Sequence, residues 1–304
     1  MTNAVPTRHL ARGIAELARS HGGVLSRELL RAHGIDRHRV RNQLAAQRWR
    51  AHGRHTIAMH TGELGDVARA WRAIWEVGAT RAVLDGVSAL QMAGMVGFET
   101  SAEVVSVHHV ARVPEVEGVA VKKVRHRDHA DLAGAGVPRT RPAVAAVHAA
   151  RWAHSDRQAA LLLLLPVQQR LTTGHAVRAA AIDHPGRTRR ALIRTLIDDI
   201  CDGAHSLGEL DFARLCRRRG LPPPERQVVC RTAAGRIYLD VRWARQSLVV
   251  EIDGAGHRAG LALTDDNLRA NAVTLGNERV LRIDLVGLRL YPDAFLDQVA
   301  AALR

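Results

Sequence analysis

The chain has 304 residues, which is enough for two or three domains with separate cores. Its 44 Lys and Arg outnumber its 30 Asp and Glu, and a formal charge of +14 favours a polyanionic partner. The three cysteines show no CxxC spacing, which argues against a disulfide framework or a zinc ribbon. The first residues lack the apolar core of a signal peptide, and the apolar run at 161–167 is too short to span a bilayer. We therefore expect a soluble cytoplasmic protein.

Three short helices are predicted in residues 1–60. Apolar residues recur at helical spacing over 8–20, and a pair of glycines ends that helix. Ser26 and Asp36 stand where N-caps are expected, because their side-chain oxygens can accept from the first free N–H groups of a helix. The third helix is predicted over residues 37–47.

A hairpin with its turn at Gly53 is predicted over residues 49–59, so the segment has the outline of a winged helix-turn-helix, whose third helix reads the DNA major groove. Residues 1–60 carry eleven arginines against three acidic residues, over half of the chain's surplus charge. The expected DNA contacts are Arg37, His38, Arg41, Asn42, Arg50 and Arg54. The alternative is a small basic domain that docks on its neighbour.

The run GGVLSRELLRAHGIDRHRVRNQLAAQRWRAHGRHTIAM resembles the N-terminal domain of the AbiEi-type antitoxins. This resemblance implies that residues 61–140 form the α/β segment that follows the winged helix in that family. It also implies a repressor of its own operon with a cognate toxin as partner. Within this segment, His108 and His109 are adjacent in a predicted strand and are expected on opposite faces, which makes them a poor metal pair.

Residues 141–203 are predicted to be a helical connector, with helices near 142–154, 156–171, 176–182 and 187–201. The last of these helices carries a basic face made of Arg187, Arg189, Arg190 and Arg194. Two interpretations remain open for that face: contact with phosphate, or a solvated surface.

An acidic hairpin is predicted near the C-terminus. An apolar run at 237–243 contains Asp240, and a second run at 247–252 leads into Glu251, Asp253 and His257. If Asp240 lies across the hairpin from the other two carboxylates, the three converge on one patch. Like charges so close together favour a divalent cation bound by oxygen ligands.

The pattern of Asp240, ten residues, then Glu-x-Asp-Gly-x-x-His resembles the core of the DUF559 endonuclease-like proteins. These belong to the PD-(D/E)xK nuclease superfamily, near the very-short-patch mismatch-repair endonucleases. The resemblance covers residues 204–304 and implies Mg²⁺ or Mn²⁺ held by Asp240 and Glu251, with Glu209 of the preceding helix completing the site. It implies that His257 acts as general acid or base, and that Asp253 stands where the superfamily has its lysine.

The sequence thus predicts an α+β multidomain protein with four parts: a winged helix (1–60), an α/β segment (61–140), a helical connector (141–203) and a restriction-endonuclease-like α/β domain with a central mixed sheet (204–304). One predicted function is a DNA-binding, Mg²⁺-dependent endonuclease or nickase acting on double-stranded DNA. The other is an antitoxin-type autorepressor whose nuclease-like domain is inactive and serves as a scaffold or partner surface.

Overall fold

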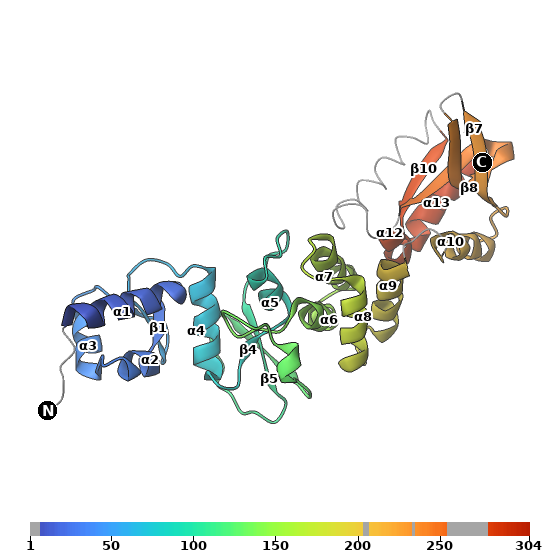
Figure 1. The fold of residues 1–304 in the computed structure, drawn as a ribbon. Helices are drawn as coiled ribbons and strands as arrows, with labels where there is room; N and C mark the ends of the chain where they lie inside the picture. The colour runs from blue at the N-terminus through green and yellow to red at the C-terminus, as the bar shows by residue number, and fades with distance from the viewer. Residues whose placement is uncertain (1–6, 203–206, 233–234, 254–278) are drawn as a thin grey trace. The chain divides into compact units, whose positions relative to one another are not determined.

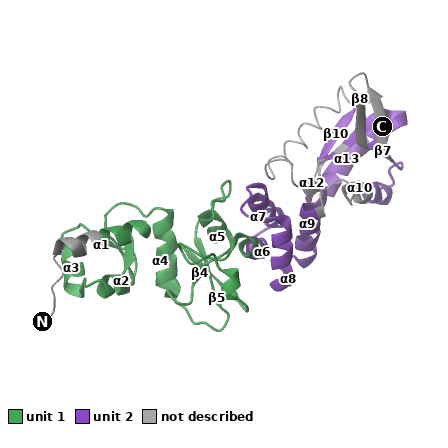
Figure 2. Ribbon diagram, in the orientation of Figure 1, with its two compact units in different colours: residues 1–145 green, residues 146–304 purple. Residues whose placement is uncertain are grey.

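A computed structural model describes residues 7–202, 207–232, 235–253 and 279–304 (Figure 1). The protein is a multidomain α+β chain with three small sheets, as the sequence predicts at that level. It divides into two compact units, residues 1–145 and 146–304 (Figure 2). Helix α6 (Pro142–Trp152) crosses this division. The finer division into four parts stays a prediction.

The first unit begins with three helices and a small antiparallel sheet. The helices are α1 (Thr7–Ser20), α2 (Arg27–Ala32) and α3 (Arg37–Ala45), and the strands are β1 (Val24–Ser26), β2 (Arg50–Ala51) and β3 (Thr56–Ala58) in the order β1-β3-β2. Both predicted caps are confirmed: Ser26 Oγ accepts from Leu29 N at 3.0 Å, and Asp36 Oδ1 accepts from Arg39 N at 2.7 Å. The strand β1 was not predicted, and it adds a third strand to the expected hairpin.

A separate small core holds this part together. Its buried residues are Ile14, Ala18, Leu25, Leu30, Ile35, Val40 and Ile57, with Trp49 and Met59 packed against them. Val40 of α3 is buried in this core. The opposite side of this short helix therefore faces solvent.

The remainder of the first unit contains helices α4 (Asp66–Gly78) and α5 (Gly86–Met92), the short η1 (His129–Asp131) and a sheet of order β4-β5-β6. The strands are β4 (Val83–Leu84), β5 (Glu103–His108) and β6 (Val119–Val124), and β5 and β6 run parallel. The last turn of α1 leads to His21, whose ring lies 4.5 Å from that of Trp71 on α4, and Trp71 in turn stacks on Trp75 at 5.2 Å.

The expectation for the adjacent histidines of this sheet was wrong. Strand β5 ends at His108, so strand alternation does not extend to His109. Their ring centroids lie 4.4 Å apart instead of on opposite faces.

The second unit starts with the predicted helical connector: α6, α7 (Asp156–Gln168), α8 (Gly174–Asp183) and α9 (Arg190–Asp202). The leucine run of α7 is buried from Leu162 to Leu165 and forms part of the core of this unit. Helix α9 begins three residues later than predicted because Arg189 has a positive φ of 51° and breaks the helical path.

A four-stranded mixed sheet forms the core of the C-terminal part. Its strands are β7 (Glu225–Thr232), β8 (Gly235–Trp243), β9 (Leu248–Asp253) and β10 (Val280–Asp284), in the order β10-β9-β8-β7, and its helices are α10 (Leu207–Arg218), α12 (Leu285–Leu290) and α13 (Pro292–Leu303). Strands β7, β8 and β9 are antiparallel neighbours, whereas β10 runs parallel to β9. The predicted hairpin is therefore confirmed, with the 3₁₀ turn η2 (Ala244–Gln246) and Ser247 at φ 51° between its strands.

A buried ion pair joins helices α9 and α12. Asp199 of α9 accepts two hydrogen bonds from the Arg289 guanidinium of α12, at 3.1 and 3.2 Å, and only 3% of the Asp199 side chain is exposed.

None of the helices in the described ranges has the length and apolar character needed to cross a bilayer.

Candidate nucleic-acid interface

Helix α3 presents the first group of predicted contact residues to solvent. Arg37, His38, Arg41 and Asn42 are all exposed. Asp36 fixes where the helix starts, and burial of Val40 fixes which side faces the core, so the local sequence determines the outward face. Arg41 Nη2 lies 2.9 Å from His38 Nδ1, one turn back on the same face.

The β2–β3 hairpin carries the other two predicted contact residues, and it is anchored by a buried acid. Arg50 and Arg54 are exposed on it. Both carboxylate oxygens of Glu76, on α4, accept hydrogen bonds from the hairpin turn. The donors are Arg54 N at 2.8 Å, His55 N at 2.8 Å, Thr56 N at 2.8 Å and Thr56 Oγ1 at 2.7 Å. Glu76 is 7% exposed and Thr56 is fully buried, so water does not compete for these bonds.

Gly53 allows the carboxylate to come this close. It has φ of 131°, a conformation that L side chains rarely adopt, and a Cβ there would lie 2.4 Å from Glu76 Cδ. Gly53, which the sequence predicts as the turn residue of the hairpin, therefore has a second role. It leaves space for an anchor that lies 23 positions later in the sequence, and sequence patterning did not reveal that anchor.

A second tie runs from α4 to the hairpin. Arg72 Nε donates to the His52 carbonyl at 2.7 Å, and its Nη1 donates to the Glu117 carbonyl at 3.1 Å. Partial burial lowers the pKa of His52, and the positive charges of Arg50, Arg72 and His60 lower it further. The imidazole is therefore neutral near pH 7, and the positive charge of the hairpin comes from its arginines.

In the C-terminal part, the described side chains on one face of the mixed sheet pack against helices. Alternate strand residues are buried against α10, α12 and α13, and these residues are Val241, Trp243, Leu248, Val250, Ile252, Leu281 and Ile283. The helices contribute Phe212, Leu288, Phe295 and Val299. Because strand residues alternate between faces, the positions between these apolar residues belong to the other face.

The predicted metal ligands occupy such alternate positions. Val241 of β8 lies opposite Val250 of β9 in the antiparallel register. The β8–β9 pairing ends there, and Asp240 and Glu251 are the next residues beyond it on the two neighbouring strands. The two positions on which the metal prediction depends therefore lie at the same end of this pairing.

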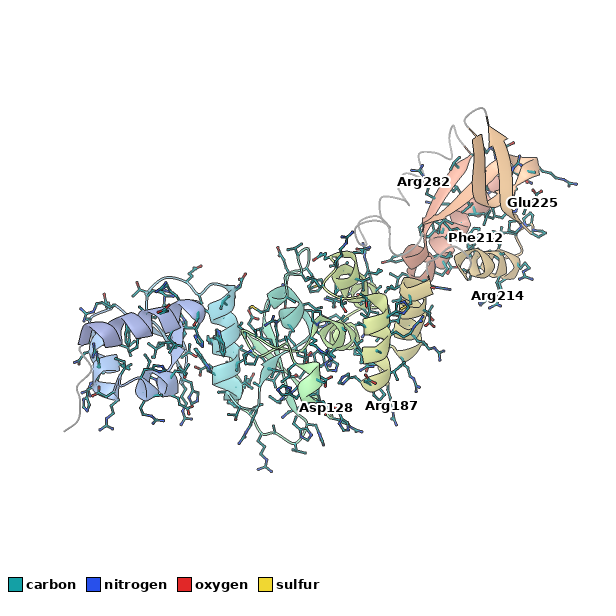
Figure 3. The ribbon with its side chains drawn as sticks, in the orientation of Figure 1. Asp128, Arg187, Phe212, Arg214, Glu225 and Arg282 are labelled. Carbon is teal, nitrogen blue, oxygen red and sulfur yellow. The ribbon has the colours of Figure 1, made fainter. Side chains whose placement is uncertain are left out.

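The parallel pairing adds a basic residue to this neighbourhood. Arg282 of β10 is in register with Glu251, and Asp284 is in register with Asp253. Arg282 is exposed and lies between buried Leu281 and Ile283 (Figure 3). The sequence alone assigns Arg282 no role, because it does not reveal the parallel register of β10 with β9.

Two other predicted site residues have a different status. Glu209 lies on α10, which precedes the first strand of the sheet as predicted. His257 lies outside the described residues. Among the side chains that the structure describes, which do not include those of Glu209, Asp240, Glu251 and Asp253, no three His, Cys, Asp or Glu come together at a spacing that suits a metal ion.

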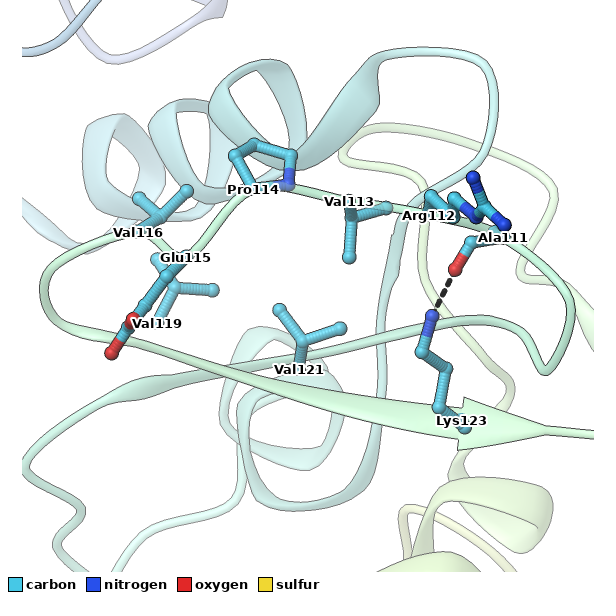
Figure 4. Close-up of a pocket in the computed structure, with 9 residues that line it drawn as sticks. All are labelled: Ala111, Arg112, Val113, Pro114, Glu115, Val116, Val119, Val121 and Lys123. Carbon is cyan, nitrogen blue, oxygen red and sulfur yellow. Dashed lines mark hydrogen bonds between the residues drawn. The ribbon is translucent and has the colours of Figure 1, made fainter.

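A shallow pocket of about 470 Å³ lies elsewhere, between the loop at 111–116 and strand β6 (Figure 4). Valine is the commonest residue in its lining, and the Lys123 ammonium donates to the Ala111 carbonyl across it. No predicted site residue lies there.

Comparisons with known proteins add little to this picture. No model of a known protein family matches the chain, and no curated protein matches it. Among solved structures, it is similar to the crystal structure of the RV2827C protein from Mycobacterium tuberculosis, with 19% sequence identity and a TM-score of 0.40. That match covers 65% of this chain and 78% of the other.

Proposed function

We propose that this protein binds double-stranded DNA through α3 and the β2–β3 hairpin, in the manner of a winged helix-turn-helix. The proposal depends on one observation: the predicted contact residues of the helix and of the hairpin are all exposed. These residues are Arg37, His38, Arg41, Asn42, Arg50 and Arg54. Only residues 46–49 separate the helix from the first hairpin strand, so the two elements are close neighbours in the chain.

The chemistry of these side chains suits duplex DNA. Arginine forms bidentate contacts with phosphate and with guanine, and asparagine can pair with adenine, so the α3 residues can both position and read a duplex. The hairpin arginines lie on a turn that Glu76 holds through four hydrogen bonds. A hairpin fixed in advance loses less conformational entropy on binding than a mobile one.

Fluorescence anisotropy with labelled duplexes tests this function in the full chain. Arg37→Ala combined with Arg41→Ala should weaken binding roughly tenfold or more, and should reduce the slope of log K against log salt by about 0.9 for each phosphate that the variant no longer neutralises. Arg125→Ala, at an exposed position after β6, removes one charge without touching α3 or the hairpin and should change affinity less than about twofold. Equal losses in both variants would show that net charge alone, and not this surface, determines binding.

A second candidate function, phosphodiester cleavage, is favoured by the positions of Asp240 and Glu251, each one residue beyond the paired Val241 and Val250 on neighbouring strands. Paired carboxylates on neighbouring strands suit Mg²⁺, which supplies a Lewis acid that polarises a phosphoryl oxygen. Asp240 and Glu251 would hold the ion, and Arg282 would place a positive charge beside the phosphate. His257 and Asp253 would assist proton transfer and water positioning, and Glu209 would complete the ligand set.

Supercoiled plasmid incubated with Mg²⁺, with Mn²⁺ and with EDTA tests cleavage. Metal-dependent nicking that is lost in Asp240→Ala and in Glu251→Ala, but kept in Glu225→Ala on the exposed start of β7, would support the nuclease.

The rival function is that of an autorepressor. A folded protein that leaves plasmid, single-stranded and mismatched DNA intact, yet binds the DNA upstream of its own gene, would favour the repressor. In that case Asp240→Ala would leave binding unchanged.

A further inference from the structure

Three helices of the connector enclose a pocket to which the sequence assigns no role. Its volume is about 410 Å³, within the range of small-ligand sites. Helices α6, α8 and α9 and the loop between the last two supply its lining, all within the second unit. Arginines and isoleucines make up most of the lining.

The charge of the pocket is strongly positive. Four arginines line it, one from α6, one from α8 and two from α9, namely Arg151, Arg178, Arg190 and Arg194. The acidic group in the lining is Asp198, and its Oδ1 lies 3.2 Å from Arg178 Nη2. Among the described residues, no ion pair involves Arg151, Arg190 or Arg194. The lining therefore has three more positive than negative charges.

Arg151 is a partly buried member of the lining. Its Nε and Cζ lie so near Gly186 that a Cβ at that glycine would come within 2.7 Å of Nε. Burial lowers the pKa of Arg151, and no acidic group offsets that effect. A partly buried guanidinium without a carboxylate partner is costly unless a ligand supplies the negative charge. By contrast, Arg189 does not line the pocket, because its Nε donates to Asp156 Oδ1 at 2.8 Å.

The lining also has an apolar part, which a simple anion would leave uncovered. Ile193 and Ile197 of α9 are buried at 3% and 2% exposure and form part of the wall. Ile182, at the end of α8, also lines the pocket and is 72% exposed, although burying an isoleucine is favourable by about 1.5–3 kcal/mol in general. A ligand with a flat or apolar body would cover it.

We propose that this pocket binds a nucleoside diphosphate. The diphosphate group carries up to three negative charges, which matches the excess charge of the lining, and guanidinium groups bind phosphate oxygens through paired hydrogen bonds. The base would lie against the isoleucines. Duplex DNA fits less well, because its phosphates would reach the exposed Arg190 and Arg194 but not the partly buried Arg151. The proposal does not depend on the proposed function.

Isothermal titration of the full chain in EDTA tests this site apart from the predicted metal site. ADP or GDP should bind with one-to-one stoichiometry, pyrophosphate roughly tenfold more weakly, and adenosine without measurable heat. The two exposed arginines allow a variant that should keep the fold: Arg190→Ala with Arg194→Ala should weaken binding at least about 30-fold. The matched control, Arg187→Ala, removes an exposed arginine of the same segment that does not line the pocket (Figure 3), and should change affinity less than about twofold.

Several results would overturn the proposal. They are the absence of binding of both nucleotides at millimolar concentration, equal affinity for pyrophosphate and for ADP or GDP, and equal losses in the double variant and in Arg187→Ala. A double variant that loses affinity for duplex DNA but keeps its nucleotide affinity would also overturn it, since these arginines would then serve DNA.

Discussion

Removal of the Glu76 carboxylate should release the β2–β3 hairpin while leaving the remainder of the first unit folded. The Glu76→Ala variant loses four hydrogen bonds, of which the two from fully buried Thr56 have no access to water. An unsatisfied buried donor costs about 1–3 kcal/mol, whereas exposed Arg54 and His55 can bond to water instead. We therefore expect the local free energy of opening to fall by about 2–4 kcal/mol.

Amide hydrogen exchange read by mass spectrometry on peptides spanning residues 50–60 measures this change directly. A loss of about 2–4 kcal/mol corresponds to exchange roughly 30- to 1,000-fold faster, at about 1.4 kcal/mol for each factor of ten. Glu76→Gln keeps one acceptor oxygen and should show a smaller acceleration. Asp66→Ala is the control on the same helix, because its side chain is 85% exposed and makes no bond to the hairpin.

The reasoning would be refuted by exchange in residues 50–60 that stays within about threefold of wild type in Glu76→Ala, since a contribution below about 0.7 kcal/mol would mean that the four bonds do not hold the turn. Equal acceleration across all peptides of the unit would also contradict it. That pattern would indicate general unfolding rather than release of one hairpin.

Three other outcomes are expected. The Arg39 backbone N–H holds the pKa of Asp36 below 3.8. The ionised Asp36 cap therefore stabilises the fold above that pH, and this stabilisation is lost as the pH falls through the lowered value. The stability difference between wild type and Asp36→Asn, measured by urea unfolding, should shrink between pH 5 and pH 3. Burial raises the pKa of the Cys216 thiol to about 12. Iodoacetamide at pH 8 should therefore label the partly exposed Cys201 in the folded protein, and Cys216 only after denaturation. Rapid labelling of both cysteines in the native protein would contradict the burial of Cys216. Asp199→Ala should destabilise the second unit by about 3–5 kcal/mol by removing the buried carboxylate that accepts from the Arg289 guanidinium, and the unfolding midpoint should largely recover when Arg289→Met is added.

Local rules account for the features that were predicted well. Ser26 and Asp36 cap the helices at which they stand because the acceptors and donors lie within three residues of each other. The C-terminal hairpin follows from alternation, which the buried positions of β8 and β9 confirm. In both cases the determining interactions lie within a short stretch of sequence.

Features that depend on distant partners were missed. Strand β1 has three residues, too few for a periodic pattern, and is defined by pairing with β3 more than thirty residues later. Glu76 lies between buried Trp75 and Val77, and its acceptor role depends on donors twenty positions earlier. The register that brings Arg282 beside Glu251 required knowledge of the parallel strand, and the connector pocket required three helices to be placed together.

Anchoring of the hairpin by α4 has a consequence for how this region can be inherited. Residues 1–60 contain all six predicted DNA contacts, but Glu76 and Trp71 lie beyond residue 60. Recombination at residue 60 would transfer the arginines without the acceptor that fixes their hairpin, so the smallest block that can be exchanged between proteins extends to Gly78. Within that block Glu76 constrains Gly53, because any side chain at position 53 would occupy the space of the Glu76 carboxylate. Descendants of this protein that keep Glu76 should therefore also keep Gly53.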